Sequence, residues 1–292
     1  MTISQVIYNG MQAFLPFSWA QYDFMKSALL AVLLMTPLFA LVGTAVVSKR
    51  MAFFSDVLGH SALTGVALGV LLGMPDPFWA MLVFIVVLAV CMYLFKGITR
   101  ASSDTTLGVF FAITVAFGVM MLSKGGGFNK YTVYLIGDIL TVSIRQLAIM
   151  SAVCVAILTY WFMFGNKIIL TSVNPVLARS RGVSVVFIEI SFVIVVAVLV
   201  AVSLKVIGIL MINSLLVLPA ASARLVAGNT RAYTFFSVVI SVISGVAGLI
   251  YSYYWGTASA ATIILWCAGF YLLFALAGRF VRFGRNSILK NT

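Results

Sequence analysis

The sequence predicts an all-α protein, a polytopic bundle of about eight or nine transmembrane helices with one short cytoplasmic helix between two of them. Hydrophobic residues make up 63% of the 292 residues and charged residues only 8%, against about 25% in soluble domains. The mean hydropathy is +1.19. We therefore expect a single transmembrane domain over residues 1–292, with no room for a sizeable soluble domain or a catalytic head.

Nine apolar stretches reach the length of about 20 residues that a helix needs to cross a membrane. In chain order they are Met25–Val47, Ala52–Gly73, Pro77–Phe95, Asp104–Ser123, Gln146–Gly165, Ser184–Leu204, Val206–Val226, Ala232–Trp255 and Ala258–Gly278. Together they predict a membrane bundle over residues 25–278. The stretch Ile3–Trp19 is too short and too mixed in polarity for a span, so we expect an interfacial segment over residues 1–24.

Two connections between these spans are not simple turns. Residues 125–143 are too polar to cross the membrane and too apolar for a free loop, which favours a re-entrant or surface-lying segment shielded by protein or water. Residues 171–183 should contain a short helix that begins at Asn174-Pro175 and ends near Gly182. This helix is either a solvated connector or a docking element for another subunit.

Lysine and arginine positions predict the orientation of the bundle. Thirteen of the 18 lie on one side and five on the other, and the richer side of a membrane protein faces the cytoplasm. Residues 171–183 and a basic tail over residues 279–292 are then cytoplasmic, and with nine spans the N-terminus is outside. The net charge of +12 comes from basic residues scattered singly between spans, which argues against binding of nucleic acid.

The second span contains the only histidine of the chain, His60, four residues after Asp56, which is one of only six acidic residues. Residues four apart share one face of a helix, so the two side chains should lie together. His60 lies about 12 Å along the helix from Ala52, near the middle of a hydrocarbon core about 30 Å thick. Inserting a carboxylate side chain into the membrane raises the free energy by at least about 2.5–3.5 kcal/mol. Asp56 should therefore face the protein interior or a water-filled path.

Two interpretations of Asp56 and His60 are open at this point. The side chains could form a structural pair that holds helices together. Alternatively, the carboxylate oxygen and the imidazole nitrogen could converge on a divalent cation. Two ligands are too few for a tight structural zinc site. Incomplete coordination suits a transporter, which must release its ion, and a symmetric dimer would supply four ligands.

Small residues form a second stripe on the same helix. Ser61, Gly65, Gly69 and Gly73 recur every four residues. Such a stripe allows another helix to approach closely, so we expect it to pack against a helix within or between protomers.

Other polar and thiol groups in the sequence are weaker site candidates. Glu189 should reach the cytoplasmic surface or pair with Arg181, and Asn213 should hydrogen-bond between helices. Asp138 lies in the connection before the fifth span. The three cysteines are isolated in apolar runs, which is typical of small core residues and not of a disulfide framework or a metal cluster.

Five stretches of the sequence together resemble one family. The stretch "KRMAFFSDVLGHSALTGVALGVLLG" is similar to the motif of permease subunits in ATP-binding-cassette importers for zinc, manganese and iron. The stretches "YLIGDILTVS", "LARSRGVSV", "VSLKVIGILMINSLLVLPAASARLVA" and "ATIILW" follow in the order and spacing of that family. The first and fourth stretches are the specific ones. Asn213 stands where the family usually has a small residue.

The resemblance implies a homodimeric permease in the plasma (inner) membrane of a bacterium, surrounded by lipid. A metal-binding lipoprotein or periplasmic protein would serve it outside, and a pair of ATPase subunits inside. Asp56 and His60 match the Asp-x-x-x-His of the family, which is proposed to contact the metal in transit. The chain would bind no cofactor, only the transported zinc, manganese or iron. No Walker A pattern G-x-x-x-x-G-K-[ST] occurs, so ATP hydrolysis would belong to the partner.

The resemblance also implies that residues 171–183 contain the coupling helix, which docks in a groove of the ATPase. The docking residues would be Leu177, Ala178, Arg179, Arg181 and Gly182. The alternative function is a secondary metal transporter driven by protons, with Asp56, His60 and Glu189 as the relay. Such transporters often have inverted repeats and several intramembrane carboxylates, and the sequence shows neither clearly.

Overall fold

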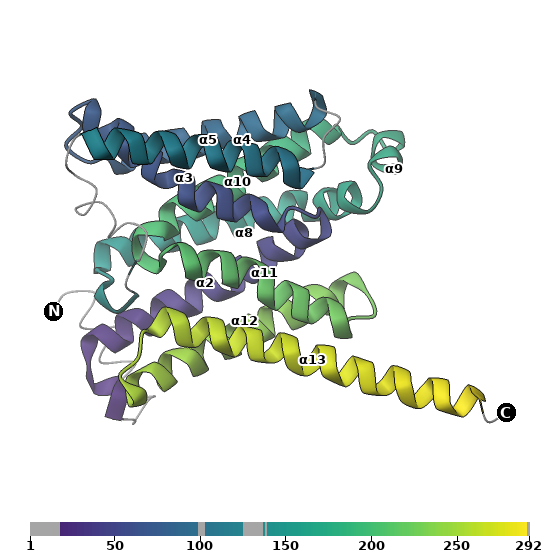
Figure 1. Ribbon diagram of the computed structural model, residues 1–292. Helices are drawn as coiled ribbons and strands as arrows, with labels where there is room; N and C mark the ends of the chain where they lie inside the picture. The colour runs from purple at the N-terminus through teal and green to yellow at the C-terminus, as the bar shows by residue number, and fades with distance from the viewer. Residues whose placement is uncertain (1–17, 99–102, 125–136, 138, 291–292) are drawn as a thin grey trace.

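The structure is a bundle of long helices. The computed structural model describes residues 18–98, 103–124, 137 and 139–290 (Figure 1). The long helices are α2 (Asp23–Ser48), α3 (Ala52–Leu71), α4 (Phe78–Ile98), α5 (Ser103–Lys124), α8 (Ile144–Val173), α10 (Val185–Ile207), α11 (Ile209–Val226), α12 (Thr230–Trp255) and α13 (Ser259–Lys290). The short ones are η1 (Ser18–Gln21), η2 (Ile139–Thr141) and α9 (Pro175–Ser180). Within the described residues no strand occurs and nine helices are long and apolar enough to cross a membrane, so the predicted all-α bundle is confirmed.

Two helices extend far beyond the predicted spans. α8 continues to Val173, past the predicted end at Gly165, so the first three residues of segment 171–183 belong to the membrane helix. α13 continues to Lys290. Most of the predicted tail over residues 279–292 is therefore a helical extension of the last span.

The two irregular segments of the sequence are only partly described. α2 begins at Asp23, so the last two residues of the segment 1–24 already belong to the first span, while residues 1–17 lie outside the described residues. Of residues 125–143, the structure describes 137 and 139–143. Ile139 and Val142 are buried, and η2 packs on α2, α10 and α13, so this end of the connection lies against the bundle.

The helices form two outer groups around a central layer. In Figure 1, α3, α4 and α5 lie on one side, α12 and α13 on the other, and α2, α8, α10 and α11 between them. α3 packs on α4 and α5, α10 packs on α4 and α8, and α2 packs on α8, α11 and α12. α9 and the C-terminal end of α13 lie at the same end of the bundle (Figure 1), as alternating spans require.

Small and hydroxyl residues allow the central helices to approach closely. On α12, Ser237 and Ser241 donate hydrogen bonds to the backbone oxygens of Ala40 and Thr36 on α2, at 3.3 and 2.9 Å. A Cβ atom on Gly245 would lie 2.6 Å from Thr36 Cγ2. Close packing and hydrogen bonds of this kind hold membrane helices together, because lipid tails are as apolar as the side chains they would replace.

The junction between α10 and α11 fixes the start of α11 against α3. Gly208 joins the two helices with φ +79, a conformation that glycine adopts without a steric penalty. Gly137 packs on this junction, where an added Cβ atom would lie 2.6 Å from Gly208 Cα. The next residue, Ile209, packs on Gly59 of α3, and a Cβ atom on Gly59 would lie 3.2 Å from Ile209 Cγ1.

Candidate functional site

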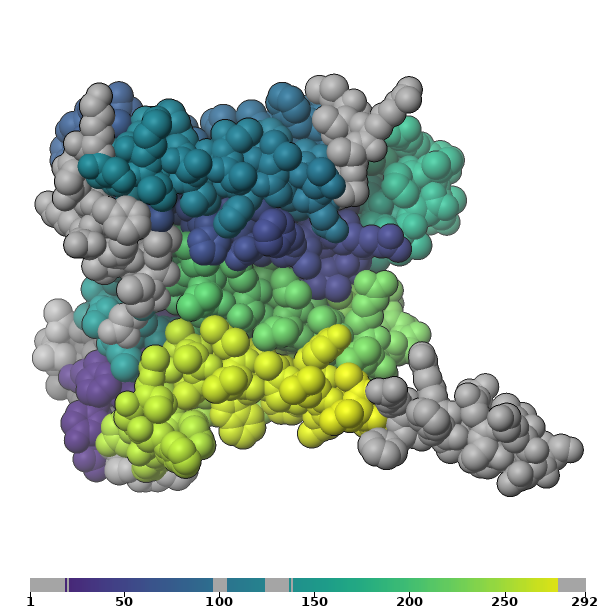
Figure 2. Space-filling view, in the orientation of Figure 1, coloured from purple at the N-terminus to yellow at the C-terminus, as the bar shows by residue number. Residues whose placement is uncertain are grey.

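Asp56 and His60 lie together on one face of α3. The helix begins at Ala52, directly after a turn in which Arg50 has φ +56. His60 Nε2 lies 3.6 Å from Asp56 Oδ1, and the two side chains are 38% and 30% exposed. In the space-filling view, α3 forms a dark blue strip between α5 above it and α11 below it (Figure 2). Part of this membrane helix is therefore not covered by the rest of the chain.

A third polar side chain reaches the pair from α11. Asn213 Nδ2 donates a hydrogen bond to Asp56 Oδ1, whereas Asn213 Oδ1 is buried without a hydrogen-bond partner. The expectation that Asn213 bonds between helices is therefore correct, but its partner was not predicted. In the sequence, only the isolated position of the Asn213 amide in an apolar span indicated a contact between helices. Periodicity along one helix cannot identify a partner 157 residues away.

Aromatic rings bound the imidazole on the α5 side. The imidazole ring of His60 and the phenyl ring of Phe111 are in edge-to-face contact. Their centroids lie 5.5 Å apart and their planes meet at 85°. Phe53 of α3 lies 5.9 Å from the same Phe111 ring. His60 therefore has an apolar wall on one side and Asp56 on the other.

The donor set of this site is small. Among the residues that the structure describes, no group of three or more His, Cys, Asp and Glu side chains could hold a metal ion. Asp56 and His60 supply two donors, fewer than the four of a closed zinc site. The cysteines are free thiols, and Cys154 and Cys267 are buried. A cation at Asp56 and His60 would need further donors from other residue types, from water or from a second copy of the chain.

The small residues of α3 pack within the same chain. Ser61 is buried and shares a hydrogen bond with Thr114 of α5. A Cβ atom on Gly65 would lie 2.6 Å from Met81 Cα on α4, and one on Gly69 would lie 2.9 Å from a side-chain atom of α4. This stripe therefore brings α4 and α5 close to the helix that holds Asp56 and His60.

Gly73, the last residue of the predicted stripe, lies outside the helix and does not pack on another helix of the same chain. α3 ends at Leu71, and Gly73 follows it with φ +67 and with no atom within 4 Å of an added Cβ. The residue is exposed and turns the chain out of the helix. The positive φ of Gly73 is a conformation that glycine adopts without a steric penalty.

The connector α9 begins and ends as the sequence predicts. The side chain of Asn174 accepts hydrogen bonds from the backbone N–H groups of Val176 and Leu177, both at 3.0 Å. Pro175 occupies the first turn, where its missing N–H costs nothing. Gly182, with φ +73, follows the helix.

Not all of the residues implied for docking are accessible. Leu177, Arg179, Arg181 and Gly182 are exposed, but Ala178 is fully buried. Ala178 therefore packs toward its own chain and cannot contact a docked partner in this arrangement, which corrects the prediction for that residue.

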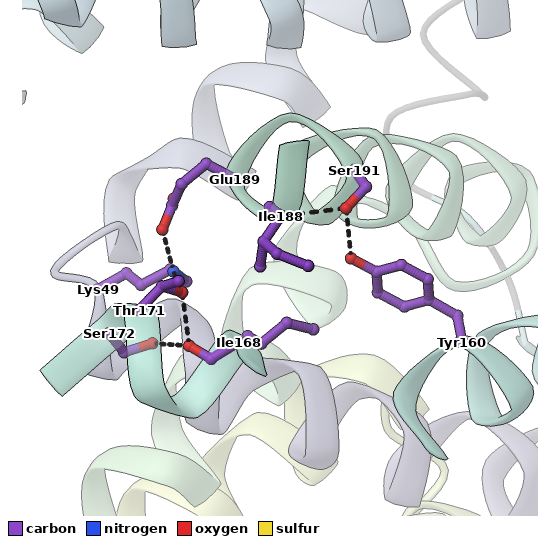
Figure 3. Close-up of polar contacts among 8 residues, drawn as sticks. All are labelled: Lys49, Tyr160, Ile168, Thr171, Ser172, Ile188, Glu189 and Ser191. Atoms are coloured by element: carbon purple, nitrogen blue, oxygen red, sulfur yellow. Dashed lines mark hydrogen bonds and ion pairs between the residues drawn. The ribbon is translucent and has the colours of Figure 1, made fainter. Parts of the chain in front are cut away.

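A buried ion pair lies among α2, α8 and α10 (Figure 3). Lys49, at the end of α2, pairs with Glu189 near the start of α10 and donates a hydrogen bond to Thr171 Oγ1 of α8 at 3.1 Å. The two charged side chains are only 4% and 17% exposed. The predicted pairing of Glu189 with Arg181 is therefore wrong.

Burial and the ion pair shift the pKa of Lys49 in opposite directions. Burial lowers the pKa of Lys49 from its ordinary value of 10.5, and the hydrogen bond and charge of Glu189 offset only part of that shift. The desolvation of the ammonium group thus exceeds its attraction to the carboxylate. An open cavity of about 610 Å³ adjoins the pair, with Pro175 of α9 among its lining residues.

Known proteins with similar sequences cover nearly the whole chain. Residues 21–278 match the family model of the ABC 3 transport family. The high-affinity zinc uptake system membrane protein ZnuB of Haemophilus influenzae is 31% identical over 259 residues, which cover 88% of this chain and 98% of that protein. The manganese import system permease protein ScaB of Streptococcus gordonii is 26% identical, with 86% and 90% covered.

A solved structure shares the arrangement of the helices. PsaBC from Streptococcus pneumoniae in complex with Fab matches with a TM-score of 0.75 at 26% sequence identity, and the match covers 92% of this chain and 94% of that chain. The family match, the sequence identity and the shared fold agree over the same residues. The chain therefore belongs to the ABC 3 transport family.

Proposed function

We propose that this chain is the permease subunit of an ATP-driven importer of divalent transition-metal ions, with zinc, manganese or iron as the transported ion. The observation that carries the proposal is the carboxylate of Asp56 beside the imidazole of His60, 3.6 Å apart on a membrane helix. Carboxylate oxygen and imidazole nitrogen are ligands that suit these metals. The names of the relatives, a zinc uptake protein and a manganese import permease, support the same class of substrate.

The proposed working unit is a homodimer with the metal path at or near its interface. Asp56 and His60 are each about one-third exposed in the single chain, and ionisable side chains inside a membrane rarely face lipid. A second copy related by a two-fold axis would cover this surface and bring two more such donors to one path. Weak, incomplete coordination on each protomer would allow the ion to be released again.

Partner subunits would supply the energy and the substrate. We propose that ATPase subunits dock on α9 through Leu177, Arg179 and Arg181, which are exposed, and that a metal-binding protein delivers the ion at the opposite end of the bundle. The excess of basic residues around α9 and the C-terminus supports a cytoplasmic location for that end. The membrane would be the bacterial plasma membrane.

Transport by the reconstituted complex tests the proposal. The chain is co-purified with its ATPase in proteoliposomes, and uptake of zinc and manganese is measured with and without ATP. We expect uptake that requires ATP and that is lost in Asp56→Ala and His60→Ala while the complex still assembles. Normal uptake by the Asp56→Leu, His60→Leu double variant would identify a structural pair and refute the site.

The same experiment distinguishes an ATP-driven importer from the alternative, a secondary transporter driven by protons. Uptake by this chain alone, driven by a proton gradient, would overturn the proposal. The third residue of that relay, Glu189, is paired with Lys49. A carboxylate held in an ion pair is a poor proton carrier, because protonation would break the pair.

A further inference from the structure

We infer that Asn213 supplies a third metal donor in each protomer, through its side-chain amide oxygen. The inference rests on the proposed function, since it assumes that the ion passes Asp56 and His60. Sequence spacing pairs these two residues on α3, whereas the third donor would come from α11. A metal bound by all three would therefore link two helices.

The observation behind this inference is an unsatisfied buried oxygen beside the carboxylate. In the part of the chain that the structure describes, two buried side-chain oxygens lack a hydrogen-bond partner, Asn213 Oδ1 and Ser244 Oγ. Most buried polar atoms in proteins are paired, so an unpaired acceptor needs an explanation. A cation at the adjacent carboxylate would give Asn213 Oδ1 the partner that it lacks.

The orientation of the amide follows from Asp56. A carboxylate oxygen accepts hydrogen bonds, so the amide presents its nitrogen to Asp56 Oδ1. The amide oxygen is then left in the interior without a donor. Rotation of the amide about its Cβ–Cγ bond exchanges the nitrogen and the oxygen. The oxygen can then approach an ion held by Asp56.

The packing around the start of α11 holds Asn213 beside Asp56. Gly208 directly precedes the helix, Ile209 packs on Gly59 of α3, and Asn213 follows one turn later. Because Gly59 lies directly before His60, the contact of Ile209 fixes α11 at the level of the site. The amide is therefore presented by the fold and does not depend on a flexible loop.

The chemistry of an amide oxygen predicts which ion the third donor favours. Carbonyl and carboxylate oxygens are hard ligands that suit manganese, whereas imidazole nitrogen suits zinc. Loss of the amide oxygen should therefore weaken manganese binding more than zinc binding. The donor set would be one nitrogen and two oxygens in each protomer.

Direct binding of manganese to purified protein tests the inference without relying on transport. The permease–ATPase complex in nanodiscs is titrated with Mn²⁺, and free Mn²⁺ is measured by electron paramagnetic resonance; Zn²⁺ is titrated in parallel by calorimetry. Asn213→Ala and Asn213→Leu both remove the amide oxygen, the first with a smaller side chain and the second with a larger one. Asn213→Asp replaces the amide oxygen with a carboxylate oxygen. Ser214→Ala is the matched control, because Ser214 Oγ donates to Leu210 O of its own helix.

We expect Asn213→Ala and Asn213→Leu to weaken Mn²⁺ binding at least about 10-fold, with a smaller effect on Zn²⁺. Asn213→Asp should bind Mn²⁺ at least as tightly as the wild type, and Ser214→Ala should match the wild type. Unchanged binding in the first two variants would overturn the inference. Loss of binding in Asn213→Asp as well would also overturn it, because the amide would then act only as a hydrogen-bond donor to Asp56. If Asp56→Ala leaves Mn²⁺ binding intact, the proposed function itself has failed.

Discussion

Replacing Glu189 by leucine should destabilise the protein, and replacing Lys49 by methionine in addition should restore its stability. The two side chains are 17% and 4% exposed, so the single variant leaves a buried ammonium group without its counter-charge. Breaking a buried pair in this way costs about 3–5 kcal/mol. Lys49 would keep its hydrogen bond to Thr171 at 3.1 Å and its place over the Phe192 ring at 5.6 Å, a contact that contributes about 0.5–2 kcal/mol. We therefore expect a loss near the lower limit, about 3 kcal/mol.

Thermal unfolding of the purified protein in detergent measures this loss. A change of 1 kcal/mol shifts the Tm of a chain of this size by about 2 °C, so Glu189→Leu should lower the Tm by about 6 °C. The Lys49→Met, Glu189→Leu double variant should lie within about 2 °C of the wild type, since apolar residues of similar volume replace buried pairs without loss. Arg181→Met, at the exposed residue that the sequence suggested as the partner, should have no effect. A double variant as unstable as the single one would refute the reasoning.

The same pair predicts how stability changes in alkaline solution. Because the pKa of Lys49 is lowered from 10.5 in the folded protein, the unfolded chain holds this proton to higher pH. Between the two pKa values the unfolded state binds more protons, so stability rises with pH in that window. The Tm of the wild type should rise relative to that of the Lys49→Met, Glu189→Leu variant as pH approaches 10.5. A relative fall would show that attraction to Glu189 dominates over burial.

Three further predictions concern the packing, the connector and the site. Leucine at Gly65 or Gly69 should disrupt assembly or transport, because any added side chain meets α4 at 3 Å or less; normal transport with both replaced would count against this. Charge reversal at Arg179 or Arg181 should reduce co-purification of the ATPase while membrane insertion is retained, and full recovery would make α9 a solvated connector. Metal uptake should fall at acidic pH, because an imidazole nitrogen binds a cation only in its neutral form, and uptake that does not depend on pH would exclude His60 as a ligand.

The positions of the spans could be predicted because length and apolar composition are sufficient for that purpose. The second span was predicted over Ala52–Gly73 and is observed over Ala52–Leu71. The end of α8 could not be predicted in the same way. Polar residues follow Gly165, and the prediction ended the span there, but the helix continues to Val173. A helix satisfies its own backbone hydrogen bonds, so it need not end where the hydrocarbon core ends.

The candidate site was predictable along one helix and not between helices. The spacing of Asp56 and His60 places them together whatever the rest of the fold does. The contact of Asn213 with Asp56 depends on which helices are neighbours, and a single sequence contains no such information. The same limit explains the error at Glu189. Arg181 is closer in sequence, but the fold brings in Lys49 from 140 residues away.

Lys49 of the ion pair and the helix that holds Asp56 and His60 belong to one continuous stretch of chain. Lys49 directly follows α2, and three residues later Ala52 begins α3, which holds Asp56 in its second turn. The partners of Lys49, Thr171 and Glu189, lie on the two helices that α9 connects. A force on α9 that moves the ends of α8 and α10 must therefore either carry the start of α3 with them or separate Lys49 from its partners. Separation leaves a buried charge unpaired and costs several kcal/mol, so concerted movement is favoured. A partner docked on α9, as proposed above, would therefore act on the helix of Asp56 and His60 through this ion pair.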